Sequence, residues 1–77
     1  IILNLDYYES LLRSIGQPTP TYVETSVTDL HRRSKEILEM VNDQNCTVCV
    51  SIDPVTKAVI VNVASFEKIL DRLEQKQ

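Results

Sequence analysis

The feature that most constrains this sequence is a likeness between its two ends. Residues 1–17 (I-I-L-N-L-D-Y-Y-E-S-L-L-R-S-I-G-Q) align without a gap to residues 59–75 (V-I-V-N-V-A-S-F-E-K-I-L-D-R-L-E-Q), at an offset of 58. The aligned identities include Ile2/Ile60, Asn4/Asn62 and Leu12/Leu70. Two interpretations fit. In the first, any strand followed by an amphipathic helix produces a similar pattern. In the second, a module is duplicated, and residues 1–17 are the last strand and helix of its first copy.

A duplicated module predicts how the N-terminal segment packs. Tyr8, Leu11, Leu12 and Ile15 follow the i, i+3, i+4, i+7 spacing of one helical stripe, which is too apolar to leave in water. The strand over Ile1–Leu5 also needs a partner for its backbone groups. We therefore expect this strand and helix to pack beside the equivalent strand (59–63) and helix, from the same chain or from a twofold partner.

Local signals divide the chain into three parts. The first, residues 1–17, is a strand and a helix, with Asp6 and Glu9 forming a capping box and Gly16 ending the helix in the left-handed conformation. Two prolines then mark residues 18–22 as a linker. Residues 23–77 form the main domain.

The main domain is expected to contain a strand, a helix, a hairpin and a last helix. The strand covers Thr21–Thr25, and the helix runs from the cap Ser26 to about Val41. The hairpin joins Thr47–Ile52 to Ala58–Val63, and Ser65 caps the last helix, whose stripe begins at Phe66. One apolar hairpin face is expected from Val48, Val50, Ile52, Val59, Val61 and Val63, covered by Leu30, Ile37, Leu38 and Val41. The fold class is α+β.

Two segments of the main domain resemble a known family. S-V-T-D-L-H-R-R-S-K-E-I-L-E-M-V is followed by A-V-I-V-N-V-A-S-F-E-K-I-L, a pattern similar to the prevent-host-death (Phd/YefM) antitoxins. The resemblance covers Val23–Gln75 and is most specific at A-V-I-V-x-x-x-S-F-E. It implies an antitoxin that dimerises, represses its own operon by binding operator DNA, and neutralises a toxin through a tail beyond Gln77. The basic hairpin turn of the family is replaced here by a turn that contains Asp53.

The one dense basic run offers a DNA-binding surface. His31, Arg32, Arg33 and Lys35 lie in one helix of a chain whose net charge is −3, and Lys57 lies near the hairpin turn. Arginine and lysine supply the donors that contact phosphates. Alternatively, Arg32–Glu36 and Lys35–Glu39 are i,i+4 ion pairs on a solvated face. The corresponding alternative function is a protein–protein interaction or dimerisation module of the same fold that does not bind DNA.

Other function classes find little support in the sequence. One histidine and one glycine do not assemble a nucleophile–base set or a phosphate loop, so we expect no enzyme and no cofactor. Cys46 and Cys49 form a C-x-x-C pattern that enters a strand, where positions three apart face opposite ways, so we expect no metal site. No apolar run approaches the length of a membrane span, and no secretion signal is visible. We expect a cytoplasmic homodimer, or a quasi-symmetric assembly through residues 1–17.

Overall fold

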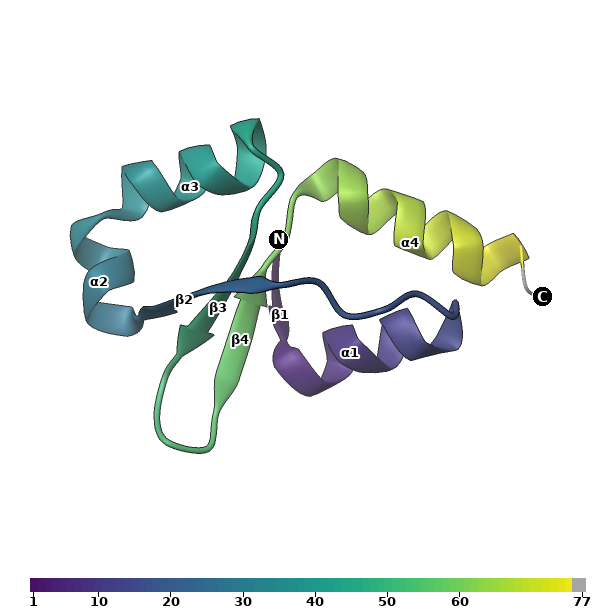
Figure 1. The fold of residues 1–77 in the computed structure, drawn as a ribbon, viewed down its shortest axis with the longest axis horizontal. Helices are drawn as coiled ribbons and strands as arrows, with labels where there is room; N and C mark the ends of the chain where they lie inside the picture. The colour runs from purple at the N-terminus through teal and green to yellow at the C-terminus, as the bar shows by residue number, and fades with distance from the viewer. Residues whose placement is uncertain (76–77) are drawn as a thin grey trace.

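A computed structural model describes residues 1–75, which form a mixed α+β fold of four strands and four helices (Figure 1). The expected α+β class is confirmed. In chain order the elements are β1 (Ile2–Asn4), α1 (Leu5–Ser14), β2 (Tyr22–Ser26), α2 (Val27–Arg32), α3 (Ser34–Asp43), β3 (Thr47–Ser51), β4 (Lys57–Ile60) and α4 (Val63–Gln75).

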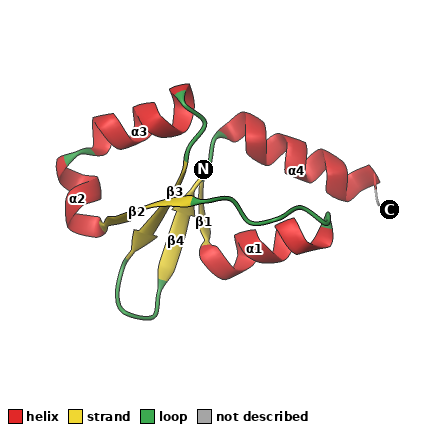
Figure 2. Ribbon diagram, viewed as in Figure 1, coloured by secondary structure: helices red, strands yellow, loops and turns green. Residues whose placement is uncertain are grey.

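The four strands form one sheet in the order β1-β4-β3-β2 (Figure 2). The expected antiparallel hairpin is confirmed as β3 and β4, and β1 pairs antiparallel with β4. Strand β2 pairs parallel with β3, because the helical crossover through α2 and α3 returns the chain to the same end of the sheet. Residues 1–17 therefore supply β1 and α1 to the same sheet as the main domain.

The pairing of β1 with β4 relates the two ends of the sequence by a local twofold axis. Ile2 lies opposite Ile60, and these two residues are also equivalent in the alignment at offset 58. Next to them, Ile1 and Val61 exchange backbone hydrogen bonds of 2.8 and 3.1 Å. The axis passes between Ile2 and Ile60, so each strand maps onto the other. The prediction that the N-terminal strand packs beside its equivalent is confirmed, within the same chain.

The two helices that follow these strands begin at equivalent residues and are capped in the same way. The Asn4 side chain accepts hydrogen bonds from the backbone N–H groups of the second and third helical residues, at 2.9 and 3.3 Å. The Asn62 side chain does the same at 2.8 and 3.4 Å. Asparagine is among the best N-cap residues. Asn4 is the last residue of β1 and is extended, and Asn62 comes shortly after the end of β4.

Both predicted caps were therefore wrong by a few residues. Asp6 is inside α1 and donates its N–H to Asn4 rather than accepting from the first turn. Ser65 is inside α4, where its hydroxyl donates to the side chain of Asn45 at 2.8 Å. The predicted end of α1 is confirmed, because Gly16 has φ of 69° and the N–H groups of Gly16 and Gln17 bond back to Arg13 and Leu12.

The sheet buries apolar side chains on both faces rather than on one. Helices α1 and α4 cover a face whose buried residues are Tyr8, Leu12, Val59, Val61 and Ile69. Helix α3 covers the other face, where Ile37, Val41, Val48, Val50 and Ile60 are buried. The single hairpin face predicted from the sequence was wrong, because the register pairs Val48 with Ile60 and Cys49 with Val59, which puts Val59 and Val61 on the face opposite Val48 and Val50. Ile52 and Val63, which were expected on that face, and Leu38, which was expected to cover it, are each about half exposed.

The predicted single helix over 26–41 is two helices. Ser26 caps α2 as expected, accepting from the N–H of Asp29 at 3.1 Å. The helix then breaks at Arg33, whose φ and ψ are −119° and 30°. Leu30 on α2 and Ile37 on α3 both reach the same apolar cluster across this break. Val27, the first residue of α2, is 46% exposed.

Equivalent leucines in α1 and α4 provide a test of the packing. Leu12 is fully buried, whereas its equivalent Leu70 is 39% exposed. Leu12→Ala should lower the free energy of unfolding by about 2–5 kcal/mol, because it opens a cavity in the core. Leu70→Ala should cost about 1 kcal/mol or less. Urea unfolding of both variants measures the difference, and equal losses would show that the phase of α1 on the sheet is incorrect.

Candidate functional site

The structure brings four of the five predicted DNA-binding residues together where α2 meets α3. His31 and Arg32 end α2, Arg33 lies at the break, and Lys35 is in the first turn of α3. All four are exposed. We call these four residues the junction patch. Figure 1 shows that α2 lies at the opposite end of the molecule from α4.

Arg33 is the one member of the junction patch that is held by a carboxylate. Its Nε and Nη2 donate to Glu36 at 3.0 and 2.8 Å, and this contact raises the pKa of Arg33. The two side chains are 60% and 64% exposed, so water screens the pair and it contributes little to stability. Neither of the i,i+4 pairs considered for this helix, Arg32 with Glu36 and Lys35 with Glu39, forms within residues 1–75. Glu36 bonds to Arg33 instead of Arg32. Across residues 1–75, the side chains of His31, Arg32 and Lys35 have no hydrogen-bond or ion-pair partner.

The surroundings of the junction patch are acidic. Helices α2 and α3 also carry Asp29, Glu36, Glu39 and Asp43, all exposed. These carboxylates offset the three formal cations of the same helices. The positive surface is therefore local, and any anion bound there has to contact the free side chains directly.

Lys57, the fifth predicted residue, lies apart from the junction patch. It begins β4, pairs with Ser51 and is half-buried. A cavity of about 250 Å³ separates it from the start of α1, and Asn4 and Asp6 line the other side. Lys57 lies on β4, and β3 stands between β4 and β2, the strand that leads into α2.

The hairpin turn beside Lys57 is built on Asp53. One carboxylate oxygen of Asp53 accepts from the N–H groups of Val55 and Thr56, at 2.9 and 2.6 Å. These backbone hydrogen bonds lower the pKa of Asp53 from its ordinary value. The acid is thus a structural part of the turn, which explains why an aspartate occupies it.

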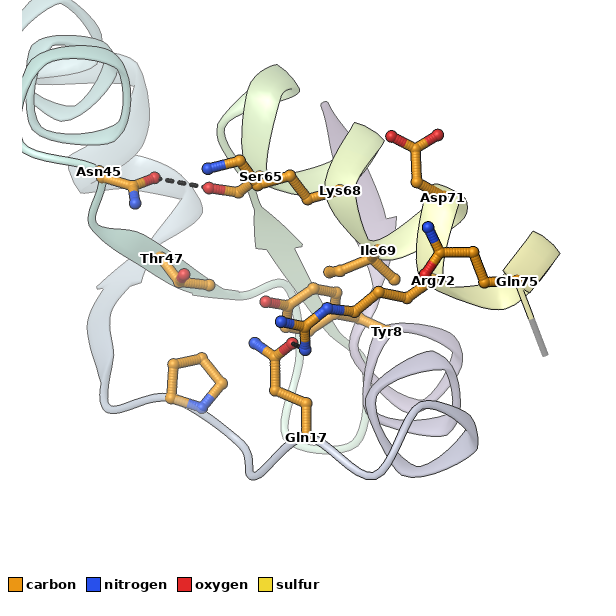
Figure 3. Close-up of a pocket in the computed structure, with 11 residues that line it drawn as sticks. Tyr8, Gln17, Asn45, Thr47, Ser65, Lys68, Ile69, Asp71, Arg72 and Gln75 are labelled. Atoms are coloured by element: carbon orange, nitrogen blue, oxygen red, sulfur yellow. Dashed lines mark hydrogen bonds between the residues drawn. The ribbon is translucent and has the colours of Figure 1, made fainter.

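A second surface, which the sequence interpretation missed, is a groove of about 620 Å³ (Figure 3). It is bordered by α4, by the segment that returns from α1 to β2, and by the start of β3. Arg72 donates to the Gln17 side chain across it at 3.3 Å. Lys68, Arg72 and Gln75 lie at i, i+4 and i+7 on α4, a polar stripe that could have been recognised in the sequence. Asp71 lies among them, so the groove has mixed charge.

Tyr8 lines this groove, and Tyr22 packs against the same apolar cluster as Tyr8. Burial is the main cause that raises the pKa of Tyr8, which a hydrogen bond with Thr47 partly opposes. Burial and then the charge of Glu9 raise the pKa of Tyr22 to about 12. The Tyr22 hydroxyl is buried without a hydrogen-bond partner in the described structure. Both side chains pack in the apolar core between α1 and the sheet.

The cysteines are separate thiols. Cys46 is half-buried and Cys49 is buried, and neither forms a disulfide. Over residues 1–75 no three side chains of histidine, cysteine, aspartate or glutamate gather as metal ligands. Among the described helices, none has the length and apolar character needed to span a membrane.

Comparisons of the chain with protein-family models, with curated proteins and with solved structures gave no match.

The lowered pKa of Asp53 predicts a pH dependence. The carboxylate stabilises the folded state fully above its ordinary pKa, and this contribution is lost as the pH falls through the lowered pKa of the folded protein. Asp53→Asn keeps the acceptor oxygen but does not titrate. Relative to this variant, the wild-type protein should lose stability between about pH 5 and pH 2, as urea unfolding can measure. An identical pH response of the two proteins would contradict the assigned role of Asp53.

Proposed function

We propose that this protein is an antitoxin-like transcriptional repressor of the Phd/YefM type, which binds duplex DNA through the junction patch. The observation that supports this most directly is the set of three exposed side chains, His31, Arg32 and Lys35, that have no protein partner. Because these side chains contact no carboxylate of the described protein, they can contact the phosphates of a duplex. The order of strand, helical segment, hairpin and helix also agrees with the fold that the resemblance implies.

Each member of the junction patch has a distinct part in this proposal. Arg32 supplies forked donors to a phosphate, and Lys35 supplies a mobile charge. Arg33 joins them by exchanging Glu36 for a phosphate, at low cost because the pair is solvated. Lys57 has no part, since it is half-buried beside the start of α1.

The acidic surroundings set the character of this binding. A chain with net charge −3 gains little from long-range attraction to DNA. Affinity then depends on a few close contacts and on two patches acting together in a dimer. Under this proposal the protein acts in the cytoplasm, and the segment that binds the toxin lies beyond Gln77.

A second function is favoured by apolar side chains on the same helices. Val27 and Leu38 are 46% and 48% exposed on α2 and α3. A protein partner that covers them would use the junction patch as a charged rim. In this alternative the domain is an interaction module and does not bind DNA.

Salt-dependent DNA binding separates the two functions. Binding to a duplex of about 25 base pairs, followed by fluorescence anisotropy between about 50 and 200 mM salt, should give a negative log–log slope. Replacing Arg32 and Lys35 with alanine should reduce that slope by about 2, because each phosphate contact contributes about 0.9. The control variant, Arg13→Ala with Lys68→Ala, makes the same charge change on α1 and α4, away from the patch, and should keep the slope.

Two results would contradict the DNA-binding proposal. One is the absence of salt-dependent binding by the wild-type protein, which would favour the interaction module. The other is an equal loss of slope in both double variants, which would show that net charge rather than the junction patch determines binding.

A further inference from the structure

Strand β1 lies at the edge of the sheet, and within residues 1–75 its outer side has no neighbouring strand. Ile1 and Val61 exchange both of their backbone hydrogen bonds. In an antiparallel ladder the next residue points its N–H and C=O the other way, so those of Ile2 face the outer edge. Among the described residues, no strand pairs with that edge.

The local twofold axis shows what such an edge binds. Ile60, the equivalent of Ile2, directs its backbone to Val48 on β3. The side chain of Ile60 is 4% exposed, because α3 covers it through Ile37 and Val41. The side chain of Ile2, on the same face of the sheet, is 69% exposed. Residues 1–75 therefore hold no equivalent of the α3–β3 segment beside β1.

The two capping asparagines also differ in the hydrogen bonds that their side-chain amides donate. Both use their carbonyl oxygen to cap a helix. The amide nitrogen of Asn62 also donates to the backbone oxygens of Val41 and Asn42 at the end of α3, at 3.2 and 3.4 Å. Within residues 1–75 the amide nitrogen of Asn4 has no acceptor and the residue is exposed.

We propose that the outer edge of β1 binds a helix–strand segment of a partner polypeptide, with the chemistry of this chain's own α3 and β3. Its strand adds antiparallel to β1 and pairs with Ile2. Branched apolar side chains at alternate positions then lie beside Ile2, as Val48 and Val50 lie beside Ile60. The end of its helix presents carbonyl oxygens to the amide of Asn4. Strand addition supplies the affinity, and the helix supplies the specificity.

A second copy of the same edge is a poorer occupant. Two β1 strands of three residues each would pair over a short length and leave both Asn4 amides without helix carbonyls. A helix–strand segment contacts all three: the outer backbone groups of Ile2, the Ile2 side chain and the Asn4 amide.

The experiment uses a synthetic peptide of residues 34–52 as the probe for this site. Titrated into the isotope-labelled protein, it should shift the backbone amide resonances of Ile2 and its neighbours and slow the hydrogen exchange of Ile2. A control peptide with Val48 and Val50 replaced by serine should not bind. Shifts centred on β2, or on β4 through displacement of the protein's own β3, would overturn the proposal.

Asn4→Asp gives a matched protein variant. Aspartate keeps the capping oxygen, so α1 and the fold are retained, but it lacks the amide donor. The dissociation constant of the peptide should rise about fivefold, as expected for one lost hydrogen bond. An unchanged constant would overturn the proposed helix contact. Concentration-dependent self-association of the wild-type protein, abolished by Ile2→Ser, would overturn the partner assignment in favour of a second copy.

Discussion

The backbone exchange between Ile1 and Val61 is the interaction on which the rest of the structure depends. It joins residues 60 apart in the sequence and fixes the register that places Ile2 opposite Ile60. That register brings α1 onto the same face as α4, because a twofold axis normal to the sheet keeps equivalent helices on one side. Leu12 and Val59 are fully buried as a result. Without this pairing, the apolar stripe of α1 would have no sheet to cover.

The local symmetry also explains why the two sides of the molecule differ. One face of the sheet is covered by the equivalent pair α1 and α4, and the other by α3 with Leu30 of α2. The crossover that carries α2 and α3 places the junction patch at the far end of the fold, away from β1 (Figure 1). The proposed DNA surface and the open edge of β1 are therefore separate, so each can be tested without disturbing the other.

The sequence was sufficient where a signal is local. The i, i+3, i+4, i+7 stripe of α1, the left-handed Gly16 and the cap at Ser26 are all confirmed. It was insufficient where neighbours decide. Cys49 looked like the polar face of a half-buried strand, yet it is 3% exposed because α1 and α4 cover that side. Likewise, spacing alone gave Arg32 an ion-pair partner in Glu36, but Glu36 bonds to Arg33 at the break between α2 and α3. The repeat was the one long-range signal in the sequence, and it predicted the pairing of the two ends.

The most direct test of this account is the distance between the α-hydrogens of Ile2 and Ile60. Because Ile1 and Val61 form the hydrogen-bonded pair, Ile2 and Ile60 form the close, non-hydrogen-bonded pair, with Cα atoms about 4.5 Å apart. The account predicts a strong nuclear Overhauser effect between these two α-hydrogens in the purified protein. A missing cross-peak, or one that joins Ile2 to Val59 or Val61 instead, would contradict the register and with it the local twofold axis.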